Sequence, residues 1–254
     1  MSAAVEPILS CQGLARSFGG LKAVQGVSLS LYPGQVTALV GPNGAGKTTV
    51  FNLITGNLRA DEGSASLRGQ SIIGLKPHRV AQMGVARSFQ DLRLFTHMSV
   101  RDNVLAATET SAWFWQPGGA AAKRDRLAAA EEALARTELT SLADSRAIDL
   151  AYAERKFLSM ARILAARASI WLLDEPASGL DLASRRRFGE LLKEARRQGV
   201  AICLIEHNLD VVMELADRIA FLDQGKVLAD GDPQSILRDP KLAAIYFGDR
   251  GEAA

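Results

Sequence analysis

Hydrophobic and polar positions alternate along the first stretch of the chain, up to about residue 31, as they do in β-strands. Apolar residues at 24, 27, 29 and 31 stand among polar or small ones and precede the turn-forming pair Pro33-Gly34. Arg68-Gly69 separates residues 64–67 from residues 70–73, which is the pattern of a hairpin. This pattern predicts antiparallel strands near the N-terminus.

Short apolar runs follow at residues 36–40, 170–173 and 201–205, and the last two contain no polar residue. The second and third are typical of strands buried on both faces of a parallel sheet. Residues 47–54 read as a helix that ends near Gly56, and residues 224–226 as the turn of a late hairpin.

A helical stretch separates the second half of the chain from the first. Residues 120–136 are rich in Ala, Glu, Lys and Arg, and Leu127, Ala130 and Leu134 fall at helical spacing, which predicts an amphipathic surface helix. Residues 113–119 form a loop or helix break whose aromatic side chains are interpreted as packing. The pattern predicts an α/β core with a mostly helical insertion at about 91–160.

Composition narrows the class of protein. The 254 residues predict roughly one to two domains. Thirty basic and 28 acidic residues leave a net charge of +2, which does not favour a nucleic-acid partner. We find neither a secretory signal nor an apolar run near the ~20 residues that span a bilayer, and we expect a soluble cytoplasmic chain that meets a membrane only through a partner. Cys11 and Cys203 are expected to be reduced core residues.

A phosphate-binding loop stands between the strand at 36–40 and the helix at 47–54. It fits the pattern G-x-x-x-x-G-K-[ST], in which backbone N–H groups and a helix N-terminus cradle phosphates. Lys47 supplies charge to the β- and γ-phosphates, and Thr48 offers a hydroxyl to Mg²⁺. The predicted ATP-binding residues here are Gly41, Pro42, Asn43, Gly44, Ala45, Gly46, Lys47, Thr48 and Thr49.

Two carboxylates close the strand at 170–173. Asp174 is placed to hold Mg²⁺, and Glu175 to accept a proton from the attacking water or to orient it. A strand ending in Asp-Glu is a weak signal alone, but it is strong after a phosphate-binding loop. ATP and Mg²⁺ are therefore the predicted ligands.

The order of the remaining motifs resembles the ATP-binding subunit of ABC transporters from Phe18 to Gly248. Gln90 follows Ser88-Phe89, residues 150–154 precede a helix, residues 176–181 follow the two carboxylates, and His207 ends Ile-Glu-His. The resemblance implies a P-loop NTPase (RecA-like) core with an N-terminal antiparallel β subdomain and an inserted helical subdomain. It implies one ATP-binding domain over 1–254, with a short extension at about 232–254.

The resemblance also implies roles for single residues. Phe18 is similar to the aromatic residue that stacks on adenine, Gln90 to the sensor of γ-phosphate and Mg²⁺, and His207 to the switch histidine, so that Glu175 and His207 are the catalytic pair. Asp181 looks like the aspartate that acts across a dimer. The signature that caps the ATP of the opposite subunit corresponds to Leu150, Ala151, Tyr152, Ala153 and Glu154.

Seven segments, among them residues 18–24, 86–90, 205–207 and 246–248, resemble the branched-chain amino acid importer type. That resemblance implies three kinds of partner: a second, related but different ATPase chain, two membrane permease subunits, and a substrate-binding protein outside the cell that acts with this chain only indirectly. It also implies a place on the cytoplasmic face of a bacterial cell membrane. Related importers take urea, amides or aromatic acids. Two other hypotheses are a soluble ABC ATPase acting on DNA or ribosomes, and a regulatory subunit that binds ATP without turnover.

The signature departs from the family pattern, because Ala153 stands where the family has Gly. If that position needed a positive φ, the extra methyl would cost roughly 1–2 kcal/mol. We then expect the site on a partner's phosphate-binding loop to be the slower one. We also expect the face around Gln90 to Val100, with part of the 91–160 insertion, to dock on a membrane subunit, because that segment carries Leu92, Leu94, Phe95 and Met98.

Overall fold

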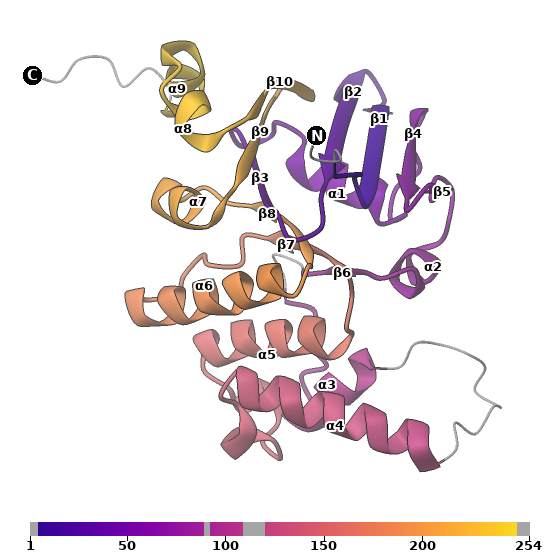
Figure 1. The fold of residues 1–254 in the computed structure, drawn as a ribbon, viewed down its shortest axis with the longest axis vertical. Coiled ribbons are helices and arrows are strands. Elements are labelled where there is room, and N and C mark those ends of the chain that lie inside the picture. Colours follow the sequence, from indigo (N-terminus) through magenta and orange to yellow (C-terminus); the bar gives the residue numbers. More distant parts are fainter. Residues whose placement is uncertain (1–4, 89–91, 109–119, 248–254) are drawn as a thin grey trace, which may run out of the picture.

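The computed structural model describes residues 5–88, 92–108 and 120–247, and its strands form two sheets (Figure 1). The four-stranded sheet is antiparallel in the order β2-β1-β4-β5. Its strands are β1 (Leu9–Phe18), β2 (Leu21–Leu31), β4 (Glu62–Leu67) and β5 (Gln70–Ser71). The predicted N-terminal antiparallel strands are confirmed. The strand expected over 70–73 is shorter, since β5 spans only Gln70–Ser71. One further backbone bond, from the Ile72 N–H to the Ala65 carbonyl at 2.9 Å, precedes the turn at Gly74.

The six-stranded sheet has the order β10-β9-β3-β8-β7-β6, and all neighbours are parallel except β10 and β9. Its strands are β3 (Val36–Val40), β6 (Val85–Arg87), β7 (Ile170–Asp174), β8 (Ala201–Ile205), β9 (Arg218–Asp223) and β10 (Lys226–Gly231). The buried parallel strands and the late hairpin predicted from the sequence are confirmed. Because β3, β8 and β7 are neighbours, their carboxyl ends meet at one edge of the sheet.

The helices form three groups along the chain, and in Figure 1 the last helix of the second group lies beside the first helix of the third. Near the first sheet lie α1 (Lys47–Ile54) and α2 (Pro77–Gln82). Between β6 and β7 lie α3 (Val100–Ala107), α4 (Ala120–Arg136), two short 3₁₀ helices (Thr140–Leu142 and Ala147–Asp149) and α5 (Tyr152–Ala165). After β7 come α6 (Leu182–Arg197), α7 (Leu209–Leu215), α8 (Pro233–Leu237) and α9 (Pro240–Phe247). The predicted helix at 120–136 is confirmed, with Ala130 and Leu134 buried.

The helices between β6 and β7 occupy the place of the predicted insertion. The expected end near residue 160 lies inside α5, which continues to Ala165 because its apolar side still packs on the core. The loop expected at 113–119 lies outside the described residues. Within the described residues, no helix is long and apolar enough to cross a bilayer.

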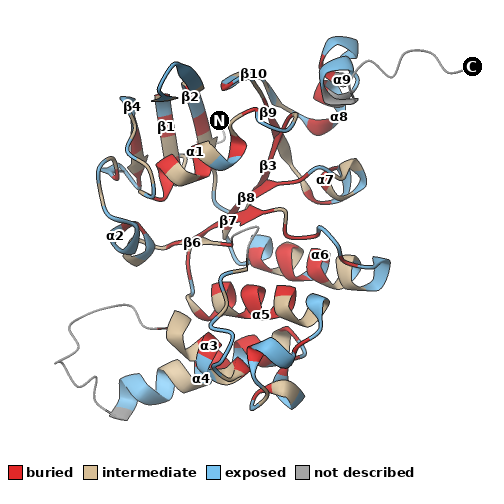
Figure 2. Cartoon of the chain, turned by 180° about the vertical axis from the view of Figure 1, so that it is seen from behind, coloured by how far each residue is buried: buried red, intermediate tan, exposed pale blue. Residues whose placement is uncertain are grey.

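The core has two halves, one on each face of the six-stranded sheet. Along β8, Ile202 and Leu204 face the helices, whereas Cys203 and Ile205 face α1 and the four-stranded sheet. Side chains of successive strand residues alternate between faces, so a strand buried on both faces needs an unbroken apolar run. Figure 2 shows the resulting buried strands between more exposed helices.

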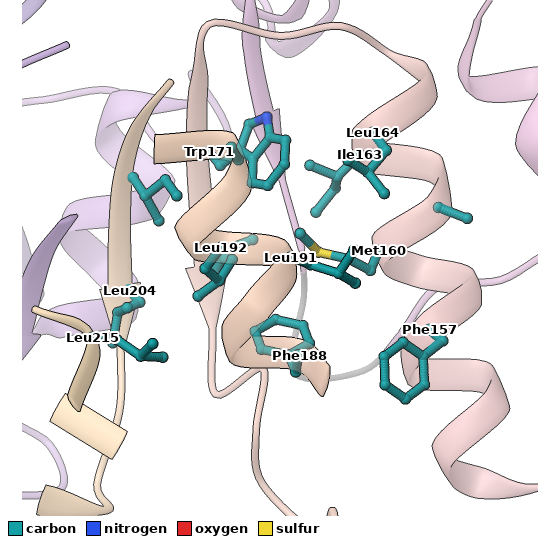
Figure 3. Packing of buried hydrophobic residues seen from close by; sticks show 14 of the residues in the cluster. Phe157, Met160, Ile163, Leu164, Trp171, Phe188, Leu191, Leu192, Leu204 and Leu215 are labelled. Carbon is teal, nitrogen blue, oxygen red and sulfur yellow. The ribbon is translucent and has the colours of Figure 1, made fainter. Parts of the chain in front are cut away.

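The helix-side half ties the inserted helices to the sheet. Figure 3 shows α5 side chains facing those of α6, with Leu204 of β8 and Leu215 of α7 on the other side of α6 and Trp171 of β7 at one end of the cluster. The labelled α5 and α6 residues are Phe157, Met160, Ile163, Leu164, Phe188, Leu191 and Leu192. Burial of each such side chain contributes about 1.5–3 kcal/mol. Packing of this kind fixes the start of α5 relative to the carboxyl end of β7.

The two cysteines both belong to the other half of the core. Cys11 and Cys203 are buried and free, and burial raises the pKa of the Cys11 thiol to about 12. Their place in the core is the one expected from the sequence, and buried thiols of this kind are inert.

Candidate functional site

The loop between β3 and α1 presents the first turn of a helix to an open cleft. Gly46 is the N-cap of α1 with φ +104°, and as a glycine it has no side chain to accept a hydrogen bond from the first turn. A Cβ at Gly46 would lie 2.4 Å from the carbonyl oxygen of Ala23, so only glycine fits. The N–H groups of the turn are left for a ligand, and a helix N-terminus favours an anionic one.

Lys47 holds a positive charge over this loop. Its ammonium donates to the carbonyl oxygens of Gly41 and Pro42, both at 2.8 Å, although the residue is buried. Burial lowers the pKa of Lys47, and the carboxylates of Glu175 and Asp174 oppose that shift. The loop therefore places one cation between a cradle of backbone N–H groups and two carboxylates, which is an arrangement suited to phosphates.

Asp174 ends β7 beside the hydroxyl of Thr48. That hydroxyl donates to Asp174 Oδ2 at 3.3 Å, and the Asp174 N–H donates to Ser88 Oγ at 3.0 Å. Arg87 lies 3.7 Å from the same carboxylate. Burial raises the pKa of Asp174, with Glu175 adding to the rise and Arg87 opposing it. A hydroxyl and a carboxylate side by side form a hard-oxygen donor set that fits Mg²⁺.

Glu175 and His207 meet because β7 and β8 are adjacent. Asp174 pairs with Ile205 in the parallel register, and the Glu175 N–H donates to the Ile205 carbonyl at 2.9 Å. The backbone of Glu175 then turns through a left-handed φ of +48°, which is uncommon for a residue with a side chain. His207 Nε2 lies 3.2 Å from Glu175 Oε1. The two predicted catalytic side chains are thus in contact.

A single cleft of about 1250 Å³ gathers most of the predicted ATP-binding residues. Phe18 stands at one part of its wall, 43% exposed, with the Arg16 guanidinium 5.1 Å from the ring centroid. An exposed ring face of this kind can stack on a base. The predicted residues that line the cleft are Phe18, Asn43, Gly44, Ala45, Gly46, Lys47, Thr48, Thr49, Glu175 and His207.

Part of the cleft wall comes from residues that sequence reasoning missed. Gln25, Gln224 and Gly225 line it, together with Lys22 and Ala23. Gln25 Nε2 donates to the Gln224 carbonyl at 2.7 Å, and the Gly225 N–H donates to the Ala45 carbonyl at 2.9 Å. The tip of the β9–β10 hairpin therefore closes the phosphate-binding loop against β2. The Gln-Gly pair signalled a turn, but nothing in it signalled what the turn would touch.

The signature residues lie elsewhere, at the exposed start of α5. None of Leu150–Glu154 is among the described residues that line the cleft. Ala151 is the N-cap, and its N–H donates to Glu154 Oε2 at 2.7 Å. Leu150 is buried and Tyr152 is 51% exposed. This helix start is therefore free to face another molecule rather than its own cleft.

Ala153 is the second residue of α5, and it is not among the non-glycine residues with positive φ. The energetic cost expected for the Ala153 methyl group applied only to a residue with a positive φ, so it does not arise here. A helical backbone accepts alanine better than glycine. The backbone at Ala153 therefore gives no reason for slower ATP turnover at the site on the partner's phosphate-binding loop.

The other predicted site residues are Asp181, Gln90 and those of the 92–98 loop. Asp181 is the N-cap of α6, and its carboxylate accepts from the Ser184 N–H at 2.7 Å. Gln90 lies outside the described residues. In the 92–98 loop, Leu94 packs on the core, whereas Phe95 is 48% and Met98 37% exposed.

Comparison with known proteins gives a consistent result. A family model described as "ABC transporter" matches residues 24–178. The chain is 40% identical over 252 residues to the high-affinity branched-chain amino acid transport ATP-binding protein LivG of Escherichia coli K12, covering 96% of this chain and 99% of the relative. It is 38% identical to BraF, a protein of the same description from Pseudomonas aeruginosa, with coverage of 96% and 98%.

Solved structures agree on the fold. A nucleotide-free ATP-binding cassette from an ABC transporter matches with a TM-score of 0.85 and 29% identity, over 96% of this chain and all of that one. The ADP conformation of an ATP-binding cassette matches with a TM-score of 0.84, at the same identity and coverage. The predicted fold class is therefore confirmed.

Proposed function

The chain belongs to the ABC transporter family as an ATPase subunit coupled to transport, and from this premise we propose that it energises the import of branched-chain amino acids. The observation that carries the ATPase chemistry is the cleft itself. It brings an exposed aromatic ring, a phosphate-binding loop, a carboxylate and a histidine to one wall from four separate segments.

In the proposed mechanism, Phe18 stacks on the adenine, and the loop N–H groups with Lys47 hold the phosphates. Thr48 and Asp174, with Gln90 by resemblance, would hold Mg²⁺, which would supply positive charge beside the phosphates. Glu175 accepts a proton from the water whose oxygen attacks the γ-phosphorus. The bond to the β-phosphate oxygen breaks, and ADP and phosphate leave.

His207 has two tasks in this proposal. Its Nε2 lies within hydrogen-bond distance of Glu175 Oε1, so it fixes the orientation of the carboxylate. Its ring also lines the cleft, where a polar contact to the γ-phosphate is within its reach. Loss of His207 therefore changes both the position of the base and the binding of the terminal phosphate.

Two copies of this architecture are needed for a complete site. The start of α5, with Leu150–Glu154, and the α6 cap Asp181 lie outside this chain's own cleft. We assign them to the ATP bound by a second, related ATPase chain, whose γ-phosphate would meet the helix N-terminus. In return, the partner's signature completes the cleft described here.

The cargo assignment rests on the descriptions of LivG and BraF, which each cover nearly all of this chain. In this proposal the cargo is held by other subunits, and this chain supplies the ATPase. The alternative cargoes are urea, amides and aromatic acids. The proposed assembly has two permease subunits and an extracellular binding protein, with this chain on the cytoplasmic face of the membrane.

We place the permease contact at the 92–98 loop and the hollows beside it. Phe95 and Met98 are the exposed apolar side chains of that loop. Two hollows of about 330 and 160 Å³ adjoin each other and share Ala86, Arg87, Ala107 and Ala166. Apolar side chains beside a concave surface are typical of a contact with another protein. Asn103 fixes the loop by bonding both the N–H and the carbonyl of Phe95, each at 2.9 Å.

The test of the catalytic assignment is Glu175→Gln in the assembled transporter. A positioned base contributes about 10²–10⁴-fold in rate, so ATP turnover should fall by that factor while ATP affinity is kept. Turnover at the parental rate would show that Glu175 is not the catalytic carboxylate. Uptake of radiolabelled leucine, urea and benzoate by the parental complex separates the cargo hypotheses.

The docking assignment has its own test. Phe95→Glu should abolish coupled transport while the isolated subunit still binds ATP. Leu228→Glu is the matched control, because Leu228 is also 48% exposed but lies on β10. Transport that survives Phe95→Glu undiminished would remove the docking surface from this loop.

A further inference from the structure

A buried lysine on α5 reaches the backbone of the catalytic carboxylate. Lys156 is only 5% exposed, and its ammonium donates to the Glu175 carbonyl oxygen at 2.8 Å. Lysine is almost never fully buried unless it is paired. Lys156 lies one turn into the helix whose first residue is Tyr152, so it joins the signature helix directly to Glu175.

The backbone at Glu175 is one that needs support. Its φ of +48° is left-handed, and a residue with a side chain keeps such a conformation only where its surroundings determine it. The Glu175 N–H is held by the Ile205 carbonyl, and its own carbonyl by Lys156. Two residues later, the Ala177 N–H donates to Glu206 Oε1 at 2.9 Å. These three hydrogen bonds fix the turn that aims the carboxylate into the cleft.

Lys156 and Glu206 also support each other electrostatically. Burial lowers the pKa of Lys156, and the charge of Glu206 is the largest opposing influence, ahead of Glu175 and Asp174. Burial raises the pKa of Glu206, and its bond from the Ala177 N–H opposes that shift, as does the charge of Lys156. Removal of either residue alone would leave the other as a buried charge with one fewer partner.

A second contact joins the same two segments. The Tyr152 hydroxyl donates to the Ser178 carbonyl at 3.3 Å, and the Lys156 ammonium lies 5.7 Å from the centroid of the Tyr152 ring. The first two turns of α5 therefore touch the segment from Glu175 to Ser178 at both ends. A tilt of this helix moves that segment with it.

We infer that Lys156 is a positioning residue for Glu175, which ties the orientation of the catalytic carboxylate in this chain's cleft to the placement of its signature helix. The inference rests on the proposed function, in which the partner's nucleotide meets the start of α5. Engagement of one site then adjusts the base of the other through Lys156. The alternative is that Lys156 is a buried, hydrogen-bonded lysine that contributes to stability alone.

The test is Lys156→Met in the assembled transporter, measured at the site built on this chain's loop, with the partner's own catalytic Glu changed to Gln. We expect kcat to fall about 10- to 100-fold, since a misplacement of about 1 Å can cost on the order of 100-fold, and KM for ATP to stay unchanged. Lys156→Arg, which keeps a charged donor, should restore part of kcat. Lys193→Met is the control, since Lys193 on α6 forms solvent-accessible ion pairs with Glu190 on the same helix and Glu214 on α7.

A change in the core alone would lower the melting temperature without this split between kcat and KM. Unchanged kcat in Lys156→Met, or a parallel rise in KM, would overturn the inference. If Lys156→Met does not fold, the double variant with Glu206→Gln removes both buried charges, and parental kcat there would equally overturn it. Glu175→Gln is run in parallel: if it too keeps the parental rate, the proposed function has failed rather than the role of Lys156.

Discussion

Replacing Ala153 by glycine should lower the free energy of unfolding and leave the rate of ATP turnover unchanged. The family pattern has glycine at this position, so a functional gain would be the simple expectation from the sequence. The structure points the other way, because Ala153 has a helical backbone in the first turn of α5 and its methyl group packs on the core. Glycine is the poorer residue in both respects.

The expected loss of stability is the sum of a helix-propensity contribution and a methyl-burial contribution. Glycine in place of alanine costs a helix about 0.5–1 kcal/mol. A fully buried methyl group is worth about 0.8 kcal/mol, so the half-buried methyl of Ala153 adds roughly 0.4 kcal/mol. The free energy of unfolding should fall by roughly 1–1.5 kcal/mol, which lowers the melting temperature by about 2–4 °C per kcal/mol in a chain of this size.

The assay has two parts. Urea or thermal unfolding of the isolated subunit gives the stability change, and Ala128→Gly, at an exposed position in α4, is the matched control for the helix term. Turnover is then measured in the assembled transporter at the site on the partner's loop, with this chain's own site silenced by Glu175→Gln. A ten-fold rise there, which corresponds to about 1.4 kcal/mol, would show that the methyl group obstructs the partner's phosphate and would refute the reasoning.

Three further outcomes are expected. Lys47→Ala should weaken ATP binding roughly 10- to 100-fold in equilibrium titration, because hydrogen bonds to charged groups are worth about 1.5–3 kcal/mol; unchanged affinity would remove Lys47 from the phosphate site. Phe18→Ala should weaken ATP binding by about 1–3 kcal/mol and should not change the binding of a bare triphosphate, and equal losses of affinity for both ligands would exclude stacking. Burial raises the pKa of Cys11 from 9.0 to about 12, so the unfolded state loses the thiol proton first and stability falls as pH rises from 9 toward 12, by roughly 2 kcal/mol at pH 10.5. Cys11→Ala should make urea unfolding less sensitive to pH over that range, and an unchanged slope would contradict this.

The parts of the site that could be predicted from the sequence are those whose signals are local. The loop from Gly41 to Thr48 carries its strand, its glycines and its lysine within a few residues, and α1 begins at Lys47 as predicted. Asp174 and Glu175 follow an unbroken apolar strand. Each of these features is fixed by neighbours along the chain, so one short window contains the whole signal.

The parts that were missed depend on contacts between distant segments. Lys156 reads as one polar residue of an amphipathic helix, and its burial depends on Glu175 and Glu206, which directly follow two different strands. Gly225 was a turn residue in the sequence, but its N–H completes the loop at Ala45. Nor does a glutamate carry any signal for a left-handed φ, which at Glu175 is imposed by its surroundings.

The inert thiols have a practical consequence for studying how the subunit moves. Both cysteines of the chain are buried in the core, so maleimide reagents should leave the native protein unmodified. A cysteine introduced at an exposed position such as Phe95 or Tyr152 would then be the one reactive site, without any prior removal of native residues. Spin labels or fluorophores placed in this way could follow the 92–98 loop and the start of α5 during the ATPase cycle, in a chain whose core is untouched.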